Sequence, residues 1–260
     1  MCTEPLPRQG IWRHAANATY ADAGAGMGDA FRTFHLDGKS VTVWRLLLDE
    51  PSSDFDAAAW GLLDHAERAR ADRFQTQTLR ARFVAAHAKM RWILGGLLSI
   101  PPDAICLITG SQGKPRIISS QNAKGLQFNL SHSGKTALLA VTTGGGVGVD
   151  LESPSNPVFE SDALLAVFSQ REQVEIQRLQ PAIRAKVVCR LWTRKEACVK
   201  ALGTGIGDAF ASLSFHSGLA DEKRCKHVVQ DHPDFLLCDM DLGSHIGALA
   251  LHPRYGNDFN

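Results

Sequence analysis

The sequence predicts an α+β fold built as a pseudo-dimer of two similar halves, and three observations lead to this prediction. The order of a strand, then helices, then several strands appears twice, once on each side of a glycine run at residues 144–146. Apolar strands of similar sequence close the two parts, TALLAVT at 136–142 and GALALHP at 247–253. Consecutive glycines are typical of a joint between structural units. We therefore expect any ligand site to lie in the crevice between the halves.

The first part of the chain predicts an extension followed by the first half of the fold. Residues 1–40 are assigned to the extension, because small and polar residues with little periodicity indicate a segment that is irregular or draped over the fold. The first half spans 41–143 and the second 144–260. VTVWRLLL at 41–48 predicts the first strand, and apolar residues at helical spacing predict helix between 64 and 98. Further strands of the first half are expected at 105–109, 126–131 and 136–142.

The second half begins with an expected strand, GVGVDLE at 146–152. Ser169 followed by Glu172 is a capping-box pattern that predicts the start of a short helix. A longer helix is expected from Pro181, which suits a first helical turn, to Gly203, which suits a helix end. The remaining strands are expected at 211–215, 226–230, 235–240 and 245–252.

Composition indicates an ordinary globular protein. Of the 260 residues, 44% are hydrophobic and 21% are charged, and the formal net charge of +1 gives no bulk affinity for nucleic acid or membranes. The six cysteines form no C-x-x-C pair, which argues against a zinc ribbon or a disulfide framework and favours reduced thiols. The sequence shows no signal-peptide core and no apolar run of membrane-spanning length. We expect a soluble cytoplasmic protein.

The strand at 146–152 carries two acids on one face. Because side chains alternate along a strand, Gly148, Asp150 and Glu152 share the face opposite the apolar residues. The two carboxylates lie roughly 7 Å apart along the strand and repel each other unless a positive group lies between them. A solvated strand face would explain the pattern, and so would a divalent metal site.

The segment WTRKEACVK offers a third acid on a helix. Trp192, Glu196 and Lys200 are spaced at i, i+4 and i+8, so they lie close to one helix face. A surface ion pair between Glu196 and Lys200 is the simpler explanation, but apolar flanks indicate a helix packed on more than one side. A carboxylate on a largely buried helix needs a cationic partner. Glu196 could therefore join Asp150 and Glu152 as an oxygen ligand of magnesium or manganese.

Two further segments supply donors for a phosphate-bearing ligand. FNLSHSG places Ser131 and His132 at a strand end, and SQGKPR places Lys114 in a turn. A lone histidine or lysine is more often structural or solvent-facing, but a metal held by carboxylates with basic donors around it suits a polyphosphate. Two nucleotide motifs fail: SGKT at 133–136 lacks the leading glycine of a P-loop, and GTGIG at 203–207 follows a helix instead of opening one.

The chain resembles the 4′-phosphopantetheinyl transferases, specifically the larger monomeric type that activates surfactin synthetase and similar assembly lines. Four stretches carry the resemblance in the family's order and approximate spacing: GKP, FNLSHSG, GVGVDLE and WTRKEACVKALGTGI. It covers residues 41 to about 253, including ERARADRFQTQTLRARFVAAHAKMR and the closing ALALHP. The resemblance implies a pseudo-dimeric α+β fold with coenzyme A between the halves. It also implies an enzyme dependent on Mg²⁺ (or Mn²⁺) that moves 4′-phosphopantetheine from coenzyme A to a serine of an acyl, peptidyl or aryl carrier protein and releases adenosine 3′,5′-bisphosphate.

The resemblance also implies roles for individual residues. The implied metal ligands are Asp150, Glu152 and Glu196. The implied catalytic residues are Glu196, His132 and Lys200, with Glu196 also the candidate base for the serine proton. Ser131 and His132 would contact the phosphates from the first half, and Lys200 would reach the pyrophosphate from the second. Further coenzyme A contacts near the adenine and 3′-phosphate are implied for Gly113, Lys114, Pro115, Arg70 and Arg82.

Two positions depart from the family pattern. Phe83 follows Arg82 where relatives can have a small hydroxyl residue, and Glu67 stands where the family has a lysine, so the grip on the 3′-phosphate is expected to differ. Two rival functions stay open: a non-catalytic coenzyme A or nucleotide-binding regulator, which would tolerate loss of the three acids, and a magnesium-dependent hydrolase of nucleotide pyrophosphates, which would need no carrier protein. A carrier-docking patch, apolar with basic rims, is expected near 203–230.

Overall fold

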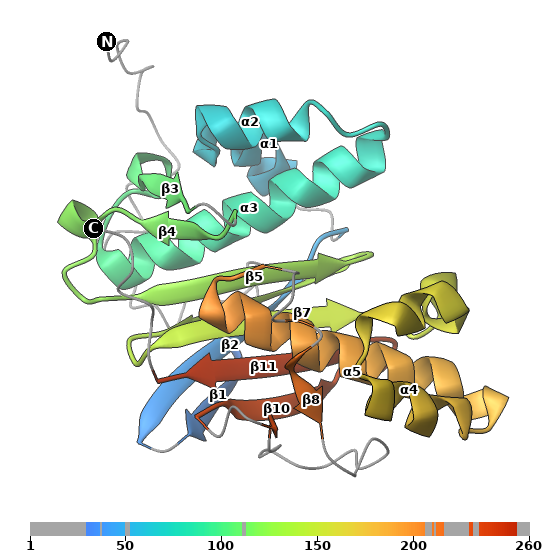
Figure 1. Cartoon of the computed structure of the whole chain (residues 1–260). Helices are drawn as coiled ribbons and strands as arrows, with labels where there is room; N and C mark the ends of the chain where they lie inside the picture. The colour runs from blue at the N-terminus through green and yellow to red at the C-terminus, as the bar shows by residue number, and fades with distance from the viewer. Residues whose placement is uncertain are drawn as a thin grey trace.

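The computed structural model describes residues 30–253, apart from 37, 50–52, 111–112, 206–209, 211, 216–228 and 231–233. Figure 1 shows an α+β architecture in which helices flank a pair of sheets. This arrangement confirms the predicted fold class. Within the described ranges, no helix is long and apolar enough to cross a membrane.

The first half is a four-stranded antiparallel sheet with a long helix packed on it. The strand order is β1-β2-β6-β5. Its strands are β1 (Ala30–Leu36), β2 (Lys39–Leu47), β5 (Gln127–Ser133) and β6 (Thr136–Thr142). Its helices are α1 (Ser53–Leu62), α2 (His65–Ala71) and α3 (Gln77–Leu98). Short elements follow: η1 (Pro102–Ala104), β3 (Leu107–Thr109), β4 (Pro115–Ile117) and η2 (Ser119–Gln121).

The expectation of an irregular extension is wrong for residues 30–36. These residues form β1, which pairs with β2 as an edge hairpin of the first sheet. The turn between the two strands contains Gly38 at a φ of +75°, a left-handed conformation that favours glycine. Residues 1–29, the rest of the expected extension, lie outside the described part of the chain.

The single helical region expected between 64 and 98 is two helices. Residues 72–76 separate α2 from α3. Thr76 is the N-cap of α3, and its side chain accepts a hydrogen bond from the main-chain N–H of Leu79. A threonine hydroxyl that satisfies a free N–H at a helix start favours a new helix over continuation of the old one.

The second half is a three-stranded antiparallel sheet of order β10-β11-β7, covered by α5. Its strands are β7 (Gly146–Glu152), β10 (Leu236–Asp241) and β11 (Ile246–His252), with a separate pair of β8 (Ser214–Phe215) and β9 (Val229–Gln230). Its helices are η3 (Pro157–Glu160), η4 (Asp162–Val167), α4 (Gln170–Gln177) and α5 (Pro181–Leu202). The predicted capping box of Ser169 and Glu172 is confirmed at α4, and Gly203 caps α5 at a φ of +77°.

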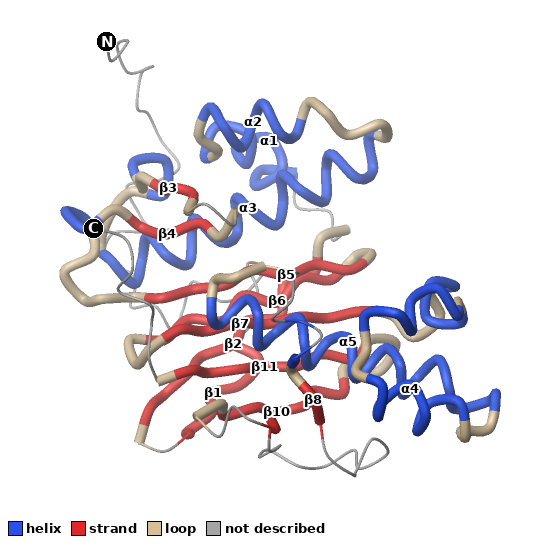
Figure 2. Tube along the Cα trace, in the orientation of Figure 1, coloured by secondary structure: helices blue, strands red, loops and turns tan. Residues whose placement is uncertain are grey.

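Two sheets between two long helices make four layers, α3, first sheet, second sheet and α5 (Figure 2). Each interface between layers holds an apolar core. Representative buried residues are Leu139 and Met90 under α3, Leu138 and Val149 between the sheets, and Ala248 and Leu191 under α5. The sheets approach each other along β5 and β7, where Asn129 Oδ1 accepts a hydrogen bond from Val149 N at 2.8 Å. The two halves are thus joined where β5, β7 and α5 meet.

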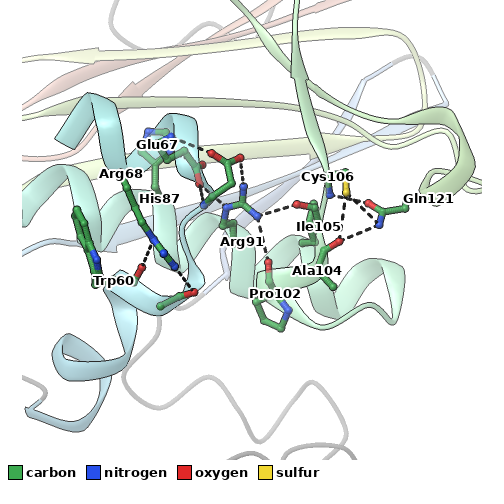
Figure 3. A network of polar contacts seen from close by, with 12 residues as sticks. Trp60, Glu67, Arg68, His87, Arg91, Pro102, Ala104, Ile105, Cys106 and Gln121 are labelled. Carbon is green, nitrogen blue, oxygen red and sulfur yellow. Dashed lines mark hydrogen bonds and ion pairs between the residues drawn. The ribbon is translucent and has the colours of Figure 1, made fainter. Parts of the chain in front are cut away.

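A buried arginine joins α2, α3 and the segment after α3 (Figure 3). The side chain of Arg91 is fully buried, and its Nε donates to Glu67 Oε2 at 2.6 Å. Its other nitrogens donate to Asp64 Oδ2 and to the carbonyl oxygens of Pro102 and Ile105. Burial opposes ionisation of Glu67, but the hydrogen bond from His87 and the charges of His87 and Arg91 hold its pKa below the usual value.

Replacing Arg91 with methionine should lower the free energy of unfolding by about 3–5 kcal/mol, because it removes the positive partner of the buried Glu67 carboxylate and the donor to the carbonyl oxygens of Pro102 and Ile105. Arg80→Met is the matched control: Arg80 pairs with Asp72 at an exposed site, where an ion pair contributes about 1 kcal/mol or less. Denaturant unfolding of both variants measures the difference. Equal destabilisation by the two substitutions would contradict a structural role for the buried network.

Candidate functional site

Strand β7 presents its acids to α5, as the alternation of its side chains predicts. Val147, Val149 and Leu151 are buried in the core between the sheets, so Gly148, Asp150 and Glu152 lie on the other face. The helix packs directly on the main chain here: a Cβ built on Gly148 would lie 1.9 Å from the carbonyl oxygen of Ala197. Glycine at this position brings α5 close enough for its side chains to meet those of β7.

Asp150 is the buried centre of the group. Its side chain is almost fully buried, and Oδ1 accepts hydrogen bonds from Lys200 Nζ at 2.7 Å and Ser131 Oγ at 2.8 Å. The second oxygen, Oδ2, is buried and has no hydrogen-bond partner among the described residues. Lys200 Nζ also lies 3.8 Å from Glu196 Oε2. One ammonium group therefore lies between carboxylates from β7 and α5.

The carboxylates are crowded enough to disturb each other's ionisation. Burial, followed by the charge of Asp150, raises the pKa of Glu152 to about 7, although Ser133 Oγ donates a hydrogen bond to it at 3.0 Å. Burial also raises the pKa of Glu196, and the charge of Asp150 adds to the effect. Three acids in one partly buried place, with one lysine among them, hold more negative charge than Lys200 alone neutralises.

These groups line one cavity of about 290 Å³. The lining residues are Leu130, Ser131, His132, Asp150, Glu152, Trp192, Glu196 and Lys200. Six of them are residues that the sequence analysis assigned to the site. Trp192 was placed on the same helix face as Glu196 and Lys200 but had no assigned role, and Leu130 was not singled out; its neighbours in FNLSHSG were the available signal. The cavity opens between β5 of the first half and β7 and α5 of the second.

His132 lines the cavity from the first half and lies near several basic side chains. His132 is solvent-exposed, yet partial desolvation lowers its pKa, and the charges of His87, Arg70 and Lys200 lower it further. Arg70 lies over the ring of Phe83 at 5.4 Å, and that ring stacks on His87 with centroids 4.0 Å apart. His87 was not predicted from the sequence; its position on α3, four residues after Phe83, was the available signal.

Two predicted basic residues have partners within the protein. Arg82 donates to both oxygens of Asp49, at 2.7 and 2.5 Å. Lys114 Nζ donates to the carbonyl oxygens of Val147 at 2.8 Å and Lys200 at 2.7 Å, and burial lowers its pKa to about 8. The neighbours of Lys114 form the turn into β4: Gly113 has a φ of +81°, and Pro115 begins the strand. The 3′-phosphate contacts expected of these residues stay predictions.

The donor set of the cavity fits a hard divalent cation. Asp150, Glu152 and Glu196 offer only oxygen atoms, which magnesium and manganese prefer. The buried Asp150 Oδ2 has no hydrogen-bond partner among the described residues, so this oxygen is able to bind a cation. Among the described residues, no three aspartate, glutamate, cysteine or histidine side chains are grouped in a way that could hold a metal ion. The ammonium of Lys200 lies among the acids instead.

Comparison with known proteins places the chain in a family. A model described as "4'-phosphopantetheinyl transferase, N-terminal" matches residues 49–144, and one described as "4'-phosphopantetheinyl transferase superfamily" matches residues 146–244. The chain is 38% identical to 4′-phosphopantetheinyl transferase HetI of Nostoc sp. over 167 residues, which are 64% of this chain and 70% of that protein. The chain belongs to the 4′-phosphopantetheinyl transferase family. It is therefore an enzyme, and its reaction class is group transfer.

Two further relatives of this 4′-phosphopantetheinyl transferase come from other bacteria. It is 32% identical to 4′-phosphopantetheinyl transferase AcpT of Escherichia coli K12, over 61% of this chain and 75% of that protein. It is 29% identical to 4′-phosphopantetheinyl transferase psf-1 of Bacillus pumilus, over 64% of this chain and 68% of that protein. The two family models meet at the glycine run, and the cavity of the transferase draws on residues from both matched regions.

Proposed function

We propose that this transferase moves 4′-phosphopantetheine from coenzyme A to a serine hydroxyl of an acyl, peptidyl or aryl carrier protein, in a Mg²⁺-dependent reaction. The apo-carrier becomes the holo-carrier, and adenosine 3′,5′-bisphosphate leaves. The observation that carries the proposal is the cavity in which Asp150, Glu152 and Glu196 lie beside Ser131, His132 and Lys200. Oxygen ligands next to phosphate donors are what a pyrophosphate substrate requires.

In the proposed reaction, this chain's donors bind the pyrophosphate of coenzyme A. Lys200 and His132 donate to its oxygens from opposite halves, and Ser131 adds a hydroxyl next to Asp150. Fixed donors stabilise the charge that develops on the leaving phosphate. To do so, Lys200 exchanges part of its contact with Asp150 for a contact with phosphate.

Asp150, Glu152 and Glu196 would hold Mg²⁺, with Mn²⁺ as an alternative. When bound, the ion supplies positive charge that neutralises the pyrophosphate and the leaving group. The buried Asp150 Oδ2, which has no hydrogen-bond partner among the described residues, supports this assignment because a cation can bind it. Burial raises the pKa values of Glu152 and Glu196, and a bound cation would favour their charged forms.

Glu196 is the proposed acceptor of the serine proton. A new bond forms between the serine oxygen and the phosphorus of phosphopantetheine, and the bond from that phosphorus to the bridging oxygen breaks. The electron pair stays on the leaving adenosine bisphosphate. Glu196 lines the cavity from α5, where an incoming hydroxyl can reach it.

For the nucleotide end, we propose contacts from Arg70 and Arg82 to the 3′-phosphate and from the main chain of Gly113, Lys114 and Pro115 to the adenine. Arg70 is exposed near His132, whereas Arg82 would have to release Asp49. At residue 67, where the family has a lysine, this chain has a buried glutamate that pairs with Arg91. Glu67 therefore offers no positive charge to the nucleotide.

We propose a monomeric, cytoplasmic enzyme of the larger, surfactin-synthetase-activating type, with the halves divided at the glycine run. Cys106, Cys189 and Cys198 are free thiols, and free thiols are typical of a reducing location. The expected carrier-docking region near 203–230 lies mostly outside the described residues.

Incubating a panel of purified apo-carrier proteins with the enzyme, coenzyme A and Mg²⁺ tests the proposal. We expect at least one carrier to gain the mass of a single phosphopantetheine group, and we expect excess chelator to stop the gain until Mg²⁺ or Mn²⁺ is restored. Mass spectrometry of the carriers is the measurement.

Omission of the carrier protein is the control for the rival activity. Release of adenosine bisphosphate without any carrier would indicate a pyrophosphate hydrolase and contradict the proposal. If the protein binds coenzyme A but forms no product with or without carrier protein, it would instead be a non-catalytic regulator that binds coenzyme A. Full transfer of phosphopantetheine in the presence of excess chelator would show that the reaction does not need a metal ion.

A further inference from the structure

Lys114 joins the first half of the enzyme to the end of α5 in the second. It lies in the turn before β4, yet its side chain extends into the second half, where Nζ donates to Val147 O on β7 at 2.8 Å and to Lys200 O on α5 at 2.7 Å. A lysine that binds two main-chain carbonyls of different elements holds those elements together.

The carbonyl of Lys200 belongs to the last turn of α5, where carbonyl groups lack intrahelical partners. The main-chain N–H groups of Gly203 and Thr204 both donate to Val199 O, so Lys200 O takes its hydrogen bond from Lys114. A cation at this position also complements the negative end of the helix dipole. Lys114 thus acts as a helix cap supplied by the other half of the protein.

The residue that Lys114 caps is a residue of the proposed site. The main chain of Lys200 is bound by Lys114, while its side chain reaches Asp150 at 2.7 Å and Ser131 at 3.3 Å. Val147, the other acceptor, lies three residues before Asp150 on β7. The Lys114 ammonium therefore holds, at a single point, the strand that carries Asp150 and the helix turn that carries Lys200.

We propose that Lys114 is a positioning residue, which holds Lys200 and β7 in register for transfer, and that its ammonium does not grip the 3′-phosphate of coenzyme A. Turning the ammonium toward a nucleotide would remove it from two carbonyls that it binds inside the protein, at a cost of lost hydrogen bonds at both. The proposal rests on the proposed function for its kinetic readout and has a second readout that does not.

The kinetic test compares Lys114→Met in the wild-type and Lys200→Ala backgrounds, with coenzyme A and with dephospho-coenzyme A. We expect Lys114→Met to lower kcat roughly 10–100-fold, as loss of a supporting contact does, and by the same factor for both substrates. In the Lys200→Ala background, Lys114→Met should lower kcat by only about threefold or less. The effects of substituting two residues that act as a unit are not additive. Lys124→Met is the matched control: its Nζ donates to Leu97 O near the end of α3, away from the cavity, and its kcat should match wild type.

Hydrogen exchange provides the readout that is independent of activity. Amides in the last turn of α5 should exchange faster in Lys114→Met than in Lys124→Met, and Lys114→Gln, which keeps an N–H donor, should lie between them. A loss confined to KM for coenzyme A and absent for dephospho-coenzyme A would overturn the proposal in favour of a 3′-phosphate contact. An undiminished loss in the Lys200→Ala background, or unchanged exchange at the end of α5, would also overturn it. Inactive wild-type enzyme would count against the proposed function alone, because the exchange result would still decide the role of Lys114.

Discussion

Replacing Asp150 with asparagine should reduce kcat/KM for phosphopantetheine transfer by about 10³-fold or more while the protein stays folded. Asp150 binds Lys200 and Ser131 through one carboxylate oxygen, and its other oxygen is buried and has no partner within the described part of the chain. Asparagine keeps the size and an acceptor oxygen for these neighbours but removes the charge. Loss of a charge-stabilising group at a phosphoryl-transfer site typically costs 10²–10³-fold or more.

Steady-state transfer to an apo-carrier and circular dichroism of the same preparations measure this effect. Glu196→Gln should show a loss of similar size, because Glu196 supplies the second acidic segment of the cavity. Asp162→Asn is the control, since its carboxylate is strongly exposed and pairs with Arg184 away from the cavity, and it should keep wild-type activity. Substantial transfer by both Asp150→Asn and Glu196→Gln would contradict the metal-holding role of these acids.

Replacing Gly148 with alanine should cost about 3 kcal/mol of folding free energy and roughly 10²-fold in activity. The new Cβ would lie 1.9 Å from Ala197 O, 2.5 Å from Ala201 N and 2.9 Å from Lys200 Cβ. Two of these contacts are with main-chain atoms of α5, so the helix itself must move away from β7. Glu196 and Lys200 would move with it, and a shift of about 1 Å in reacting groups can cost 10²-fold.

Gly61→Ala makes the same chemical change at a position where no atom of the described residues lies within 4 Å of the added Cβ. In a helix, alanine is favoured over glycine by up to about 1 kcal/mol, so this control should be neutral or slightly stabilised, with normal transfer. Thermal or denaturant unfolding and transfer kinetics compare the two variants. Wild-type stability and activity in Gly148→Ala would show that close packing of α5 on β7 does not position the site.

Local patterns in the sequence predicted the elements that build the site. The alternation in GVGVDLE placed Asp150 and Glu152 on the face of β7 that meets α5, and the bounds of α5 follow from Pro181 and Gly203. These predictions hold because they depend on the local period of side chains and on the conformational preferences of proline and glycine. The convergence of the acids with Ser131, His132 and Lys200 required the family resemblance, because spacing along the chain does not place β5 beside β7.

The structural features that the sequence did not predict depend on contacts between segments that are far apart along the chain. Residues 30–36 carry little periodicity, and they form a strand because β2 offers an unpaired edge. The interior partners of Lys114 lie 33 and 86 residues away, and those of Glu67 lie 20 and 24 residues away. A lysine in a polar turn and a glutamate in an arginine-rich helix look solvent-facing when only their neighbours in sequence are considered.

The most direct measurement is a crystal structure of the enzyme with coenzyme A and Mn²⁺, recorded with anomalous scattering from the metal. We predict an anomalous peak among the carboxylates of Asp150, Glu152 and Glu196, in contact with the pyrophosphate, with Lys200 turned from Asp150 toward a phosphate oxygen. Coenzyme A bound with its pyrophosphate in the cavity but no metal beside the three acids would contradict the proposed site. So would a pyrophosphate bound elsewhere on the protein.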